Sequence, residues 1–124
     1  MMIRDVTDLD VYNISLDLLR ETYLLCQKFP SSERSLDDQI KRAAKSIPAN
    51  IAEGFAKRVS PKEFKRFLTI ALGSSDEVVT HLRTTNIVLP FIEKSSTNLL
   101  EKYVVLSKRI NKLRSNWLTG SPTN

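Results

Sequence analysis

Cysteine, histidine, glycine and long apolar runs are all scarce in this chain of 124 residues. Its single cysteine, Cys26, excludes an internal disulfide framework and argues against a cysteine-based zinc site. Because no uncharged apolar run reaches 18 residues, we predict no membrane-spanning segment and no membrane partner. Met1 leads into acidic sequence rather than into a basic and then apolar leader, so we predict a cytoplasmic protein.

The chain also lacks the residue patterns that catalysis requires. A di-iron bundle needs two Glu-x-x-His elements, whereas the only histidine, His81, has no glutamate three residues before it. The three glycines stand too far apart to form a phosphate-binding loop. Cys26 occupies an apolar position and is interpreted as a small buried side chain rather than a nucleophile. We therefore predict that the protein is not an enzyme and has no catalytic residue, metal or cofactor.

Helical periodicity, in contrast, runs through most of the chain. Apolar side chains recur at spacings of three and four residues, which places them on one face of a helix. The run Ser60-Pro61-Lys62-Glu63 has the residues of a helix start, with serine at the N-cap and proline at the first helical position. We predict helices over residues 8–29, 36–57, 61–89 and 96–118, in one domain of residues 1–118, and a flexible tail at 119–124. Short connections favour an all-α, antiparallel up-down-up-down four-helix bundle.

The first predicted helix carries two apolar rows. One row contains Leu9, Tyr12, Leu16, Leu19, Tyr23 and Cys26, and the other contains Val11, Ile14, Leu18, Leu25 and Phe29. Together they sweep roughly 220° of the helix, against the ~100° stripe that a surface helix normally shows. We assign the first row to the core of the bundle. The second row is predicted to be an oligomer interface, formed by Val11, Ile14, Leu18 and Leu25.

Positive charge is concentrated in residues 41–66, which carry eight basic and two acidic side chains, whereas residues 1–40 carry four and eight. The turn between the second and third helices is predicted to bring five of these cations to one end of the bundle. Exposed cations of this kind bind phosphate backbones with little sequence information. The predicted nucleic-acid-binding residues are Lys57, Arg58, Lys62, Lys65 and Arg66, with Lys41 and Lys45 from the second helix.

Alternatives to nucleic-acid binding are a surface that only promotes solubility and a surface that binds an anionic protein. The phenylalanines near these cations, Phe55, Phe64 and Phe67, are predicted to be buried. Base stacking of the kind found in single-strand-binding proteins is therefore not predicted.

A polar row runs beside the apolar seam of the second helix: Gln39, Arg42, Ser46, Asn50 and Glu53. We favour a structural interpretation, with Ser74 and Glu77 of the third helix as hydrogen-bond partners, over the alternative of a ligand site. Pro48 cannot donate to the carbonyl of the preceding turn. Gly54 either ends the second helix or lets a neighbour approach, and Gly73 predicts close packing of backbones.

Residues 39–54, which read QIKRAAKSIPANIAEG, resemble the signature of a small family of four-helix-bundle proteins. These proteins are encoded in intervening sequences of bacterial 23S rRNA genes, and residues 71–77 resemble the second block of the same family. The resemblance implies a ring-shaped homopentamer and a relation to accessory variability proteins of diversity-generating retroelements. The motif residues are interpreted as structural: Arg42, Ser46, Pro48, Asn50, Glu53, Gly54, Gly73, Ser74 and Glu77.

These observations lead to one hypothesis and one alternative. The hypothesis is a non-catalytic, homo-oligomeric scaffold that binds RNA or DNA electrostatically through its basic helix ends. The alternative is a protein-interaction module that docks a polymerase-type or other protein partner.

Overall fold

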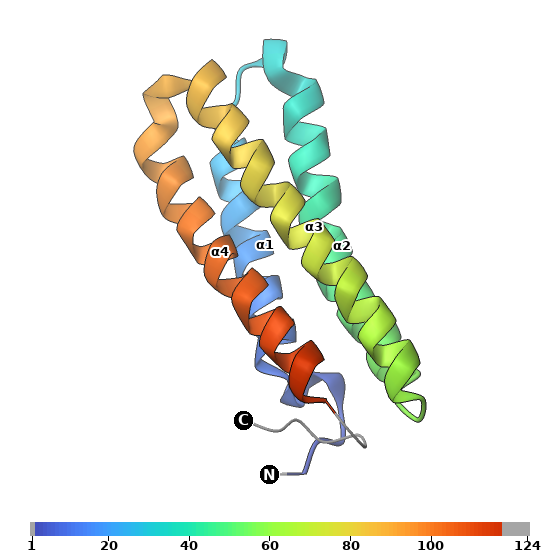
Figure 1. The fold of residues 1–124 in the computed structure, drawn as a ribbon. Helices are drawn as coiled ribbons and strands as arrows, with labels where there is room; N and C mark the ends of the chain where they lie inside the picture. Colours follow the sequence, from blue (N-terminus) through green and yellow to red (C-terminus); the bar gives the residue numbers. More distant parts are fainter. Residues whose placement is uncertain (1, 118–124) are drawn as a thin grey trace.

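Four long helices make up most of the structure, a computed structural model that describes residues 2–117 (Figure 1). They are α1 (Asp10–Cys26), α2 (Arg34–Ala56), α3 (Pro61–Val88) and α4 (Glu93–Asn116). Short 3₁₀ helices, η1 (Val6–Asp8), η2 (Ser31–Glu33) and η3 (Pro90–Ile92), precede α1, α2 and α4. Residues 2–117 contain no strand, which confirms the all-α class. The predicted tail at 119–124, and residue 118 of the fourth predicted helix, lie outside the described residues.

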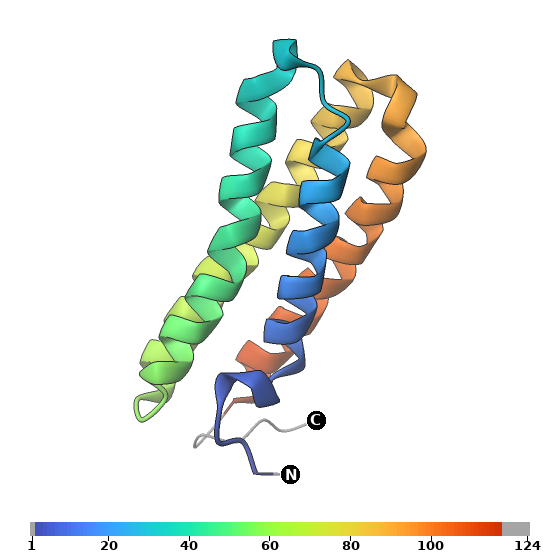
Figure 2. The same cartoon turned by 180° about the vertical axis from the view of Figure 1, so that it is seen from behind.

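The four helices lie side by side as a bundle (Figures 1 and 2). The α1–α2 and α3–α4 connections are at one end, and the α2–α3 connection is at the other (Figure 1). The end with the α2–α3 connection also holds η1 and the last turn of α4 (Figures 1 and 2). None of the described helices combines the length and apolar character that a membrane crossing would require.

The helix bounds differ from prediction mainly where 3₁₀ turns join the helices. Arg34 and Glu93, which follow η2 and η3, already have right-handed helical backbone, so α2 and α4 begin earlier than predicted. α1 instead ends at Cys26, three residues earlier than predicted. The amides of Lys28 and Phe29 donate to the carbonyls of Leu25 and Cys26, so the chain forms a tight turn with i→i+3 hydrogen bonds before Pro30. At α3 the prediction is confirmed, since the Ser60 hydroxyl accepts from the Glu63 amide at 3.2 Å.

The core consists of the apolar faces of α2, α3 and α4, with part of α1. The predicted buried positions of α2 are all buried: Leu36, Ile40, Ala43, Ile47, Ile51 and Phe55. The same holds for α3, at Phe64, Phe67, Leu68, Ala71, Ser75, Val78, Leu82 and Thr85. At the end with the α2–α3 connection, the ring of Trp117 meets Phe64 edge to face, with the ring centroids 4.6 Å apart.

On α1 both apolar rows contribute to the core: Leu9 and Cys26 of the first row are buried as predicted, and so is most of the second row. Val11, Leu18 and Leu25 are only 4–5% exposed and lie in the core of this single chain, and Ile14 packs against that core. The prediction that they form an oligomer interface is therefore wrong, because the chain's own helices already cover them. The outward-facing apolar side chains come from other positions, namely Leu16, Tyr23 and Leu24, which are 36%, 39% and 57% exposed.

Two hydroxyl residues explain why the second row is buried. Ser15 and Thr22 lie on the buried face of α1, between the apolar residues of the second row. The Ser15 hydroxyl donates to the Tyr12 carbonyl at 2.7 Å, and the Thr22 hydroxyl to the Leu18 carbonyl at 2.7 Å. The Thr22 oxygen also lies 2.7 Å from the Tyr103 hydroxyl of α4. Because their hydrogen bonds are satisfied locally, these residues can be buried although a hydropathy pattern counts them as polar.

The two helical glycines differ in the space around them. A Cβ atom on Gly54 would lie 2.6 Å from the Cβ of Phe67 and 3.0 Å from Cδ1 of Phe64, so Gly54 allows α2 and α3 to approach closely. A Cβ atom on Gly73 would meet nothing within 4 Å, and Gly73 is exposed. The predicted close packing at Gly73 is therefore wrong within this chain.

Candidate nucleic-acid interface

The α2–α3 connection gathers five cations within residues 57–66, as the sequence predicts. We call Lys57, Arg58, Lys62, Lys65 and Arg66 the basic end. α2 ends in a tight turn, in which the Lys57 amide donates to the Gly54 carbonyl and the Arg58 amide to the Phe55 carbonyl. The Ser60 cap then starts α3 at once, so two helix ends present their cations side by side. Lys57, Lys62 and Arg66 are exposed, and Arg58 and Lys65 are half-buried.

Arg58 is held in place by a neighbouring aromatic residue and the main chain. Its guanidinium carbon lies 4.0 Å from the centre of the Phe55 ring, and its Nη1 donates to the Phe55 carbonyl at 3.1 Å. Its charge also reaches the N-terminal segment. The pKa of Asp5 is lowered, mainly by hydrogen bonds from Thr7 and in smaller part by the positive charge of Arg58.

Arg66 is held in a similar way on the first turns of α3. Its guanidinium carbon lies 4.4 Å from the centre of the Phe67 ring, and Nε and Nη2 donate to the Glu63 carboxylate at 3.0 and 3.3 Å. The Nζ of Lys57 lies 4.8 Å from the same ring. The pKa of Glu63 is lowered, first by the hydrogen bonds from Arg66 and then by surrounding positive charge. Glu63 therefore offsets one of the five positive charges and leaves the basic end with an excess of cations.

The other two predicted nucleic-acid-binding residues lie elsewhere. Lys41 lies sixteen positions before Lys57, which corresponds to about 24 Å along the axis of α2. Lys41 pairs with Asp37 at 2.9 Å and lies 4.8 Å from the centre of the Tyr23 ring, so it joins α2 to α1. The hydrogen bond to Asp37 raises the pKa of Lys41. Lys45 is exposed one turn further along α2. The structure does not bring these two residues together with the basic end.

Arg114, on the last turns of α4, is a cation that sequence reasoning missed. Its Nη1 donates to the Thr69 hydroxyl of α3 at 3.1 Å, and Thr69 itself donates to the Lys65 carbonyl at 2.9 Å. Arg114 therefore lies beside the third turn of α3 and extends the basic end toward α4. The signal that could have found it is the helix order, which places the end of the fourth helix near the start of the third.

The polar row of α2 forms an interhelical network at its centre. The Ser46 hydroxyl lies 2.8 Å from the Ser74 hydroxyl, which confirms Ser74 as its predicted partner on α3. Asn50 donates to the Ser46 carbonyl and hydroxyl at 2.8 and 2.9 Å. Glu77 does not join this network, because it pairs with His81 of its own helix at 3.1 Å. These contacts support a structural role for Ser46, Asn50 and Ser74.

The remaining motif residues have varied surroundings. Pro48 and Gly54 are buried, and α2 continues through both positions. Glu53 is exposed, and its negative charge contributes, after Glu63, to the raised pKa of Arg66.

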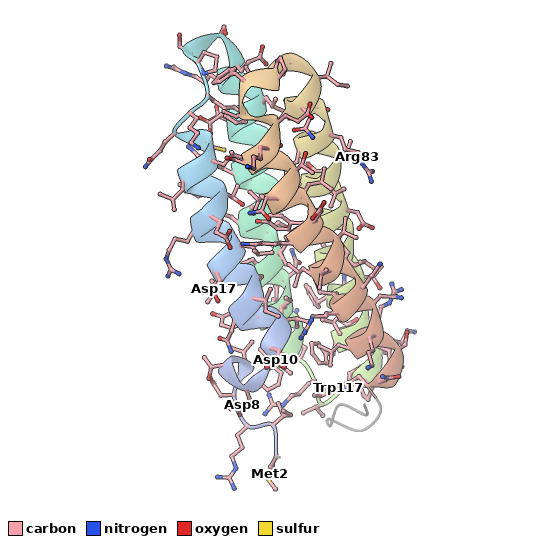
Figure 3. All side chains as sticks on the ribbon, turned by 90° about the vertical axis from the view of Figure 1, so that its left-hand side faces the viewer. Met2, Asp8, Asp10, Asp17, Arg83 and Trp117 are labelled. Atoms are coloured by element: carbon pink, nitrogen blue, oxygen red, sulfur yellow. The ribbon has the colours of Figure 1, made fainter. Side chains whose placement is uncertain are left out.

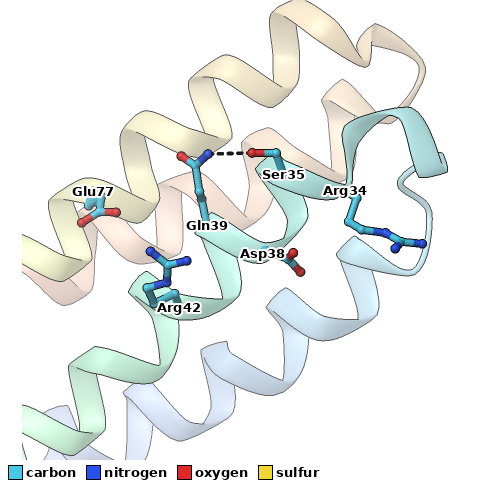
Figure 4. Close-up of a pocket in the computed structure, with 6 residues that line it drawn as sticks. All are labelled: Arg34, Ser35, Asp38, Gln39, Arg42 and Glu77. Atoms are coloured by element: carbon cyan, nitrogen blue, oxygen red, sulfur yellow. Dashed lines mark hydrogen bonds between the residues drawn. The ribbon is translucent and has the colours of Figure 1, made fainter.

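A groove of about 530 Å³ lies between α2 and α3, far along α2 from the basic end (Figure 4). Its lining residues are Arg34, Ser35, Asp38, Gln39, Arg42 and Glu77. Gln39 donates to the Ser35 hydroxyl at 3.0 Å. Arg42 lies below Gln39 and Glu77 in Figure 4, and its side chain has no hydrogen bond or ion pair within the described part of the chain. Two arginines and two carboxylates leave the groove without net charge, so it has no general affinity for polyanions.

Across residues 2–117, no group of three or more His, Cys, Asp or Glu side chains is placed to hold a metal ion. The fold and the basic end define an all-α, four-helix protein with a cluster of cations at the turn between two helices.

Comparison with known protein families identifies this class further. The family described as 23S rRNA-intervening sequence protein matches residues 7–112, and the chain belongs to that family. This confirms the resemblance carried by residues 39–54 and 71–77. A search of curated proteins finds no match. The family description names no molecular activity.

Proposed function

We propose that the protein is a non-catalytic, oligomeric scaffold that binds RNA or DNA through its basic end. The observation that carries this proposal is the presence of five cations within residues 57–66, where Glu63 is the only acidic residue. Cations at this density attract phosphates and gain affinity by releasing counterions. Because the contacts are mainly to phosphates, the basic end is expected to bind many sequences with similar affinity.

The salt dependence of binding tests this proposal. If the basic end contacts about five phosphates, log Kobs against log[salt] should have a slope near −4.5 for duplex DNA and near −3.5 for single strands. Fluorescence anisotropy with labelled RNA and DNA over a salt series measures the slope. Replacing all five cations of the basic end with glutamine should reduce affinity for every sequence and flatten the slope toward zero.

A matched control removes the same number of charges elsewhere. Exposed cations outside the basic end offer such a set: Arg20, Lys28, Arg34, Arg83 and Lys94. Figure 3 shows Arg83 toward the end of the bundle opposite to Trp117. The control variant should keep most of the affinity and the slope of the wild type. Full-strength binding by the variant that lacks the basic end, or equal loss in both variants, would contradict the proposal.

Self-association is the second part of the proposal. The antiparallel up-down-up-down bundle is expected to assemble as a ring-shaped homopentamer, in line with the family resemblance. The outward row of α1, Leu16, Tyr23 and Leu24, supports this, because single-chain folding leaves these large apolar side chains exposed. A closed ring would present several basic ends at once, and the linked sites would bind one polyanion more tightly than a single end. Light scattering measures the number of chains directly.

The alternative is a module that docks a protein partner, and a different surface favours it. Ile87, Val88 and Phe91, near the α3–α4 connection, are 80%, 43% and 69% exposed. Apolar side chains gathered at one end of a bundle are typical of contact sites with other proteins. Partner binding that survives nuclease treatment, together with the absence of a gel shift at low salt, would favour this alternative over nucleic-acid binding.

A further inference from the structure

The basic end contains two arginines whose planar groups are already fixed in place. Arg58 lies over Phe55 and Arg66 over Phe67, with the guanidinium carbons 4.0 and 4.4 Å from the ring centres. Each guanidinium has a second restraint, from the Phe55 carbonyl for Arg58 and from the Glu63 carboxylate for Arg66. Exposed arginine side chains normally sample many rotamers, so two restraints on each one remove much of the entropy that ordering would cost on binding.

A guanidinium plane with an aromatic ring on one face leaves its other face for a second flat group. The Phe67 ring is only 6% exposed, whereas the side chain of Arg66 is 54% exposed. Phe55 and Phe67 are thus buried, whereas Arg66 is exposed and Arg58 is half-buried, so the guanidinium groups are the flat groups that reach solvent. Nucleobases stack on arginine planes as they do on aromatic rings, provided that the bases are not already stacked in a duplex.

Resting on the nucleic-acid binding proposed above, we infer that the basic end recognises unpaired nucleotides, in single-stranded segments or loops, by stacking bases on Arg58 and Arg66. The lysines of the basic end, Lys57, Lys62 and Lys65, contact the phosphates that flank the stacked bases. This reverses the expectation from the sequence, in which buried phenylalanines excluded stacking. The phenylalanines act instead as supports for the arginines.

If only charge matters, the protein is expected to prefer duplexes over unpaired strands. A duplex has more phosphates per unit length than a single strand, so a purely electrostatic surface binds duplexes with the steeper salt dependence and the higher affinity at low salt. A base stacked on one arginine should favour the unpaired strand by roughly fivefold or more. Preference for unpaired strands therefore separates stacking from general attraction to phosphates.

The experiment compares a single-stranded RNA, a hairpin with an eight-nucleotide loop and a blunt duplex by fluorescence anisotropy. The test variant is Arg58→Lys/Arg66→Lys, which keeps both positive charges and removes both planes. The control variant is Arg34→Lys/Arg83→Lys, which makes the same exchange at exposed positions outside the basic end. Circular dichroism verifies that both variants keep the helical content of the wild type.

We expect the wild type to prefer the single strand and the hairpin loop over the duplex by fivefold or more. The test variant should lose that preference while its affinity for the duplex changes less than twofold, and the control variant should behave as wild type. A 2-aminopurine placed in the single strand reports on stacking independently of affinity. Its fluorescence should be quenched on binding to the wild type and quenched less by the test variant.

Two results would overturn the inference and leave the proposed function standing. One is a wild type that binds the duplex as tightly as the single strand. The other is a test variant with wild-type affinity for the single strand and unchanged 2-aminopurine quenching. Absence of binding to all three nucleic acids at low salt is a third, separate result, because it would overturn the proposed function itself.

Discussion

Adding one methyl group to each helical glycine should change stability in opposite directions. Gly54→Ala places a Cβ atom 2.6 Å from the Cβ of Phe67, whereas Gly73→Ala places one in open space. Both variants gain about 0.8–1.0 kcal/mol of helix propensity, because alanine loses less conformational freedom than glycine on folding. Packing alone therefore decides the sign.

The size of the packing penalty follows from the atoms that collide. Carbon atoms in contact are normally about 3.5–4.0 Å apart. A separation of 2.6 Å would therefore force α2 and α3 to move about 1 Å further from each other. The Cβ of Phe67 is fixed to its backbone and cannot move away by changing rotamer. Overpacking of this kind costs about 1–3 kcal/mol, and we expect a value near the upper end. After the gain in propensity, Gly54→Ala should destabilise the fold by about 2 kcal/mol and Gly73→Ala should stabilise it by about 1 kcal/mol.

Urea denaturation followed by circular dichroism at fixed protein concentration measures both changes. Because self-association would add to the apparent stability, the comparison belongs in conditions where light scattering finds single chains. A Gly54→Ala variant as stable as the wild type would refute the close approach of α2 and α3 at this position. A loss of stability in Gly73→Ala single chains would show that Gly73 has a neighbour within its own bundle.

Three further predictions concern buried groups. Leu18→Asp should destabilise the fold by about 3 kcal/mol or more, because Leu18 is buried. Leu24→Asp, at an exposed position, should leave the stability of single chains within about 0.5 kcal/mol of wild type and should dissociate an oligomer. Denaturation measures the stability of both variants, and light scattering measures the dissociation. Burial raises the pKa of the Cys26 thiol to about 12, so a thiol reagent at pH 8 should modify the native protein far more slowly than the protein in urea. Thr22→Val leaves the buried Tyr103 hydroxyl without its 2.7 Å partner and should cost about 1–3 kcal/mol, and the double variant with Tyr103→Phe should recover most of that loss in the same denaturation assay.

The sequence predicts α2 and α3 well because each has one continuous apolar face. Their buried positions follow the spacing of three and four residues, and Ser60 and Pro61 mark the start of α3 without ambiguity. α1 is different, since two apolar rows compete for the core. Hydropathy cannot choose between them, because the buried face also contains Thr22, which counts as polar although its hydroxyl bonds to the Leu18 carbonyl in α1 and, in the folded bundle, to Tyr103 of α4.

The candidate site shows the same limit of sequence reasoning. Five cations around one turn are visible as a cluster, but the sequence does not show which of them are already paired. Lys41 looks equivalent to Lys57 in the sequence, and the structure commits Lys41 to Asp37 instead. Arg114, in contrast, is far from these cations in the sequence but lies next to them in the structure, because α4 packs on α3.

Trp117, at the end of α4, is the only tryptophan of the chain and is fully buried. Its ring centroid lies 4.6 Å from that of Phe64, a residue of α3, the helix that also carries Phe67 and Arg66. Indole emission depends strongly on polarity, and because there is one tryptophan, the tryptophan fluorescence of this protein reports on a single point next to the surface proposed to bind nucleic acid. An unmodified sample can therefore report, through one optical signal, whether that end of the molecule loosens before the rest on heating or tightens when a ligand arrives.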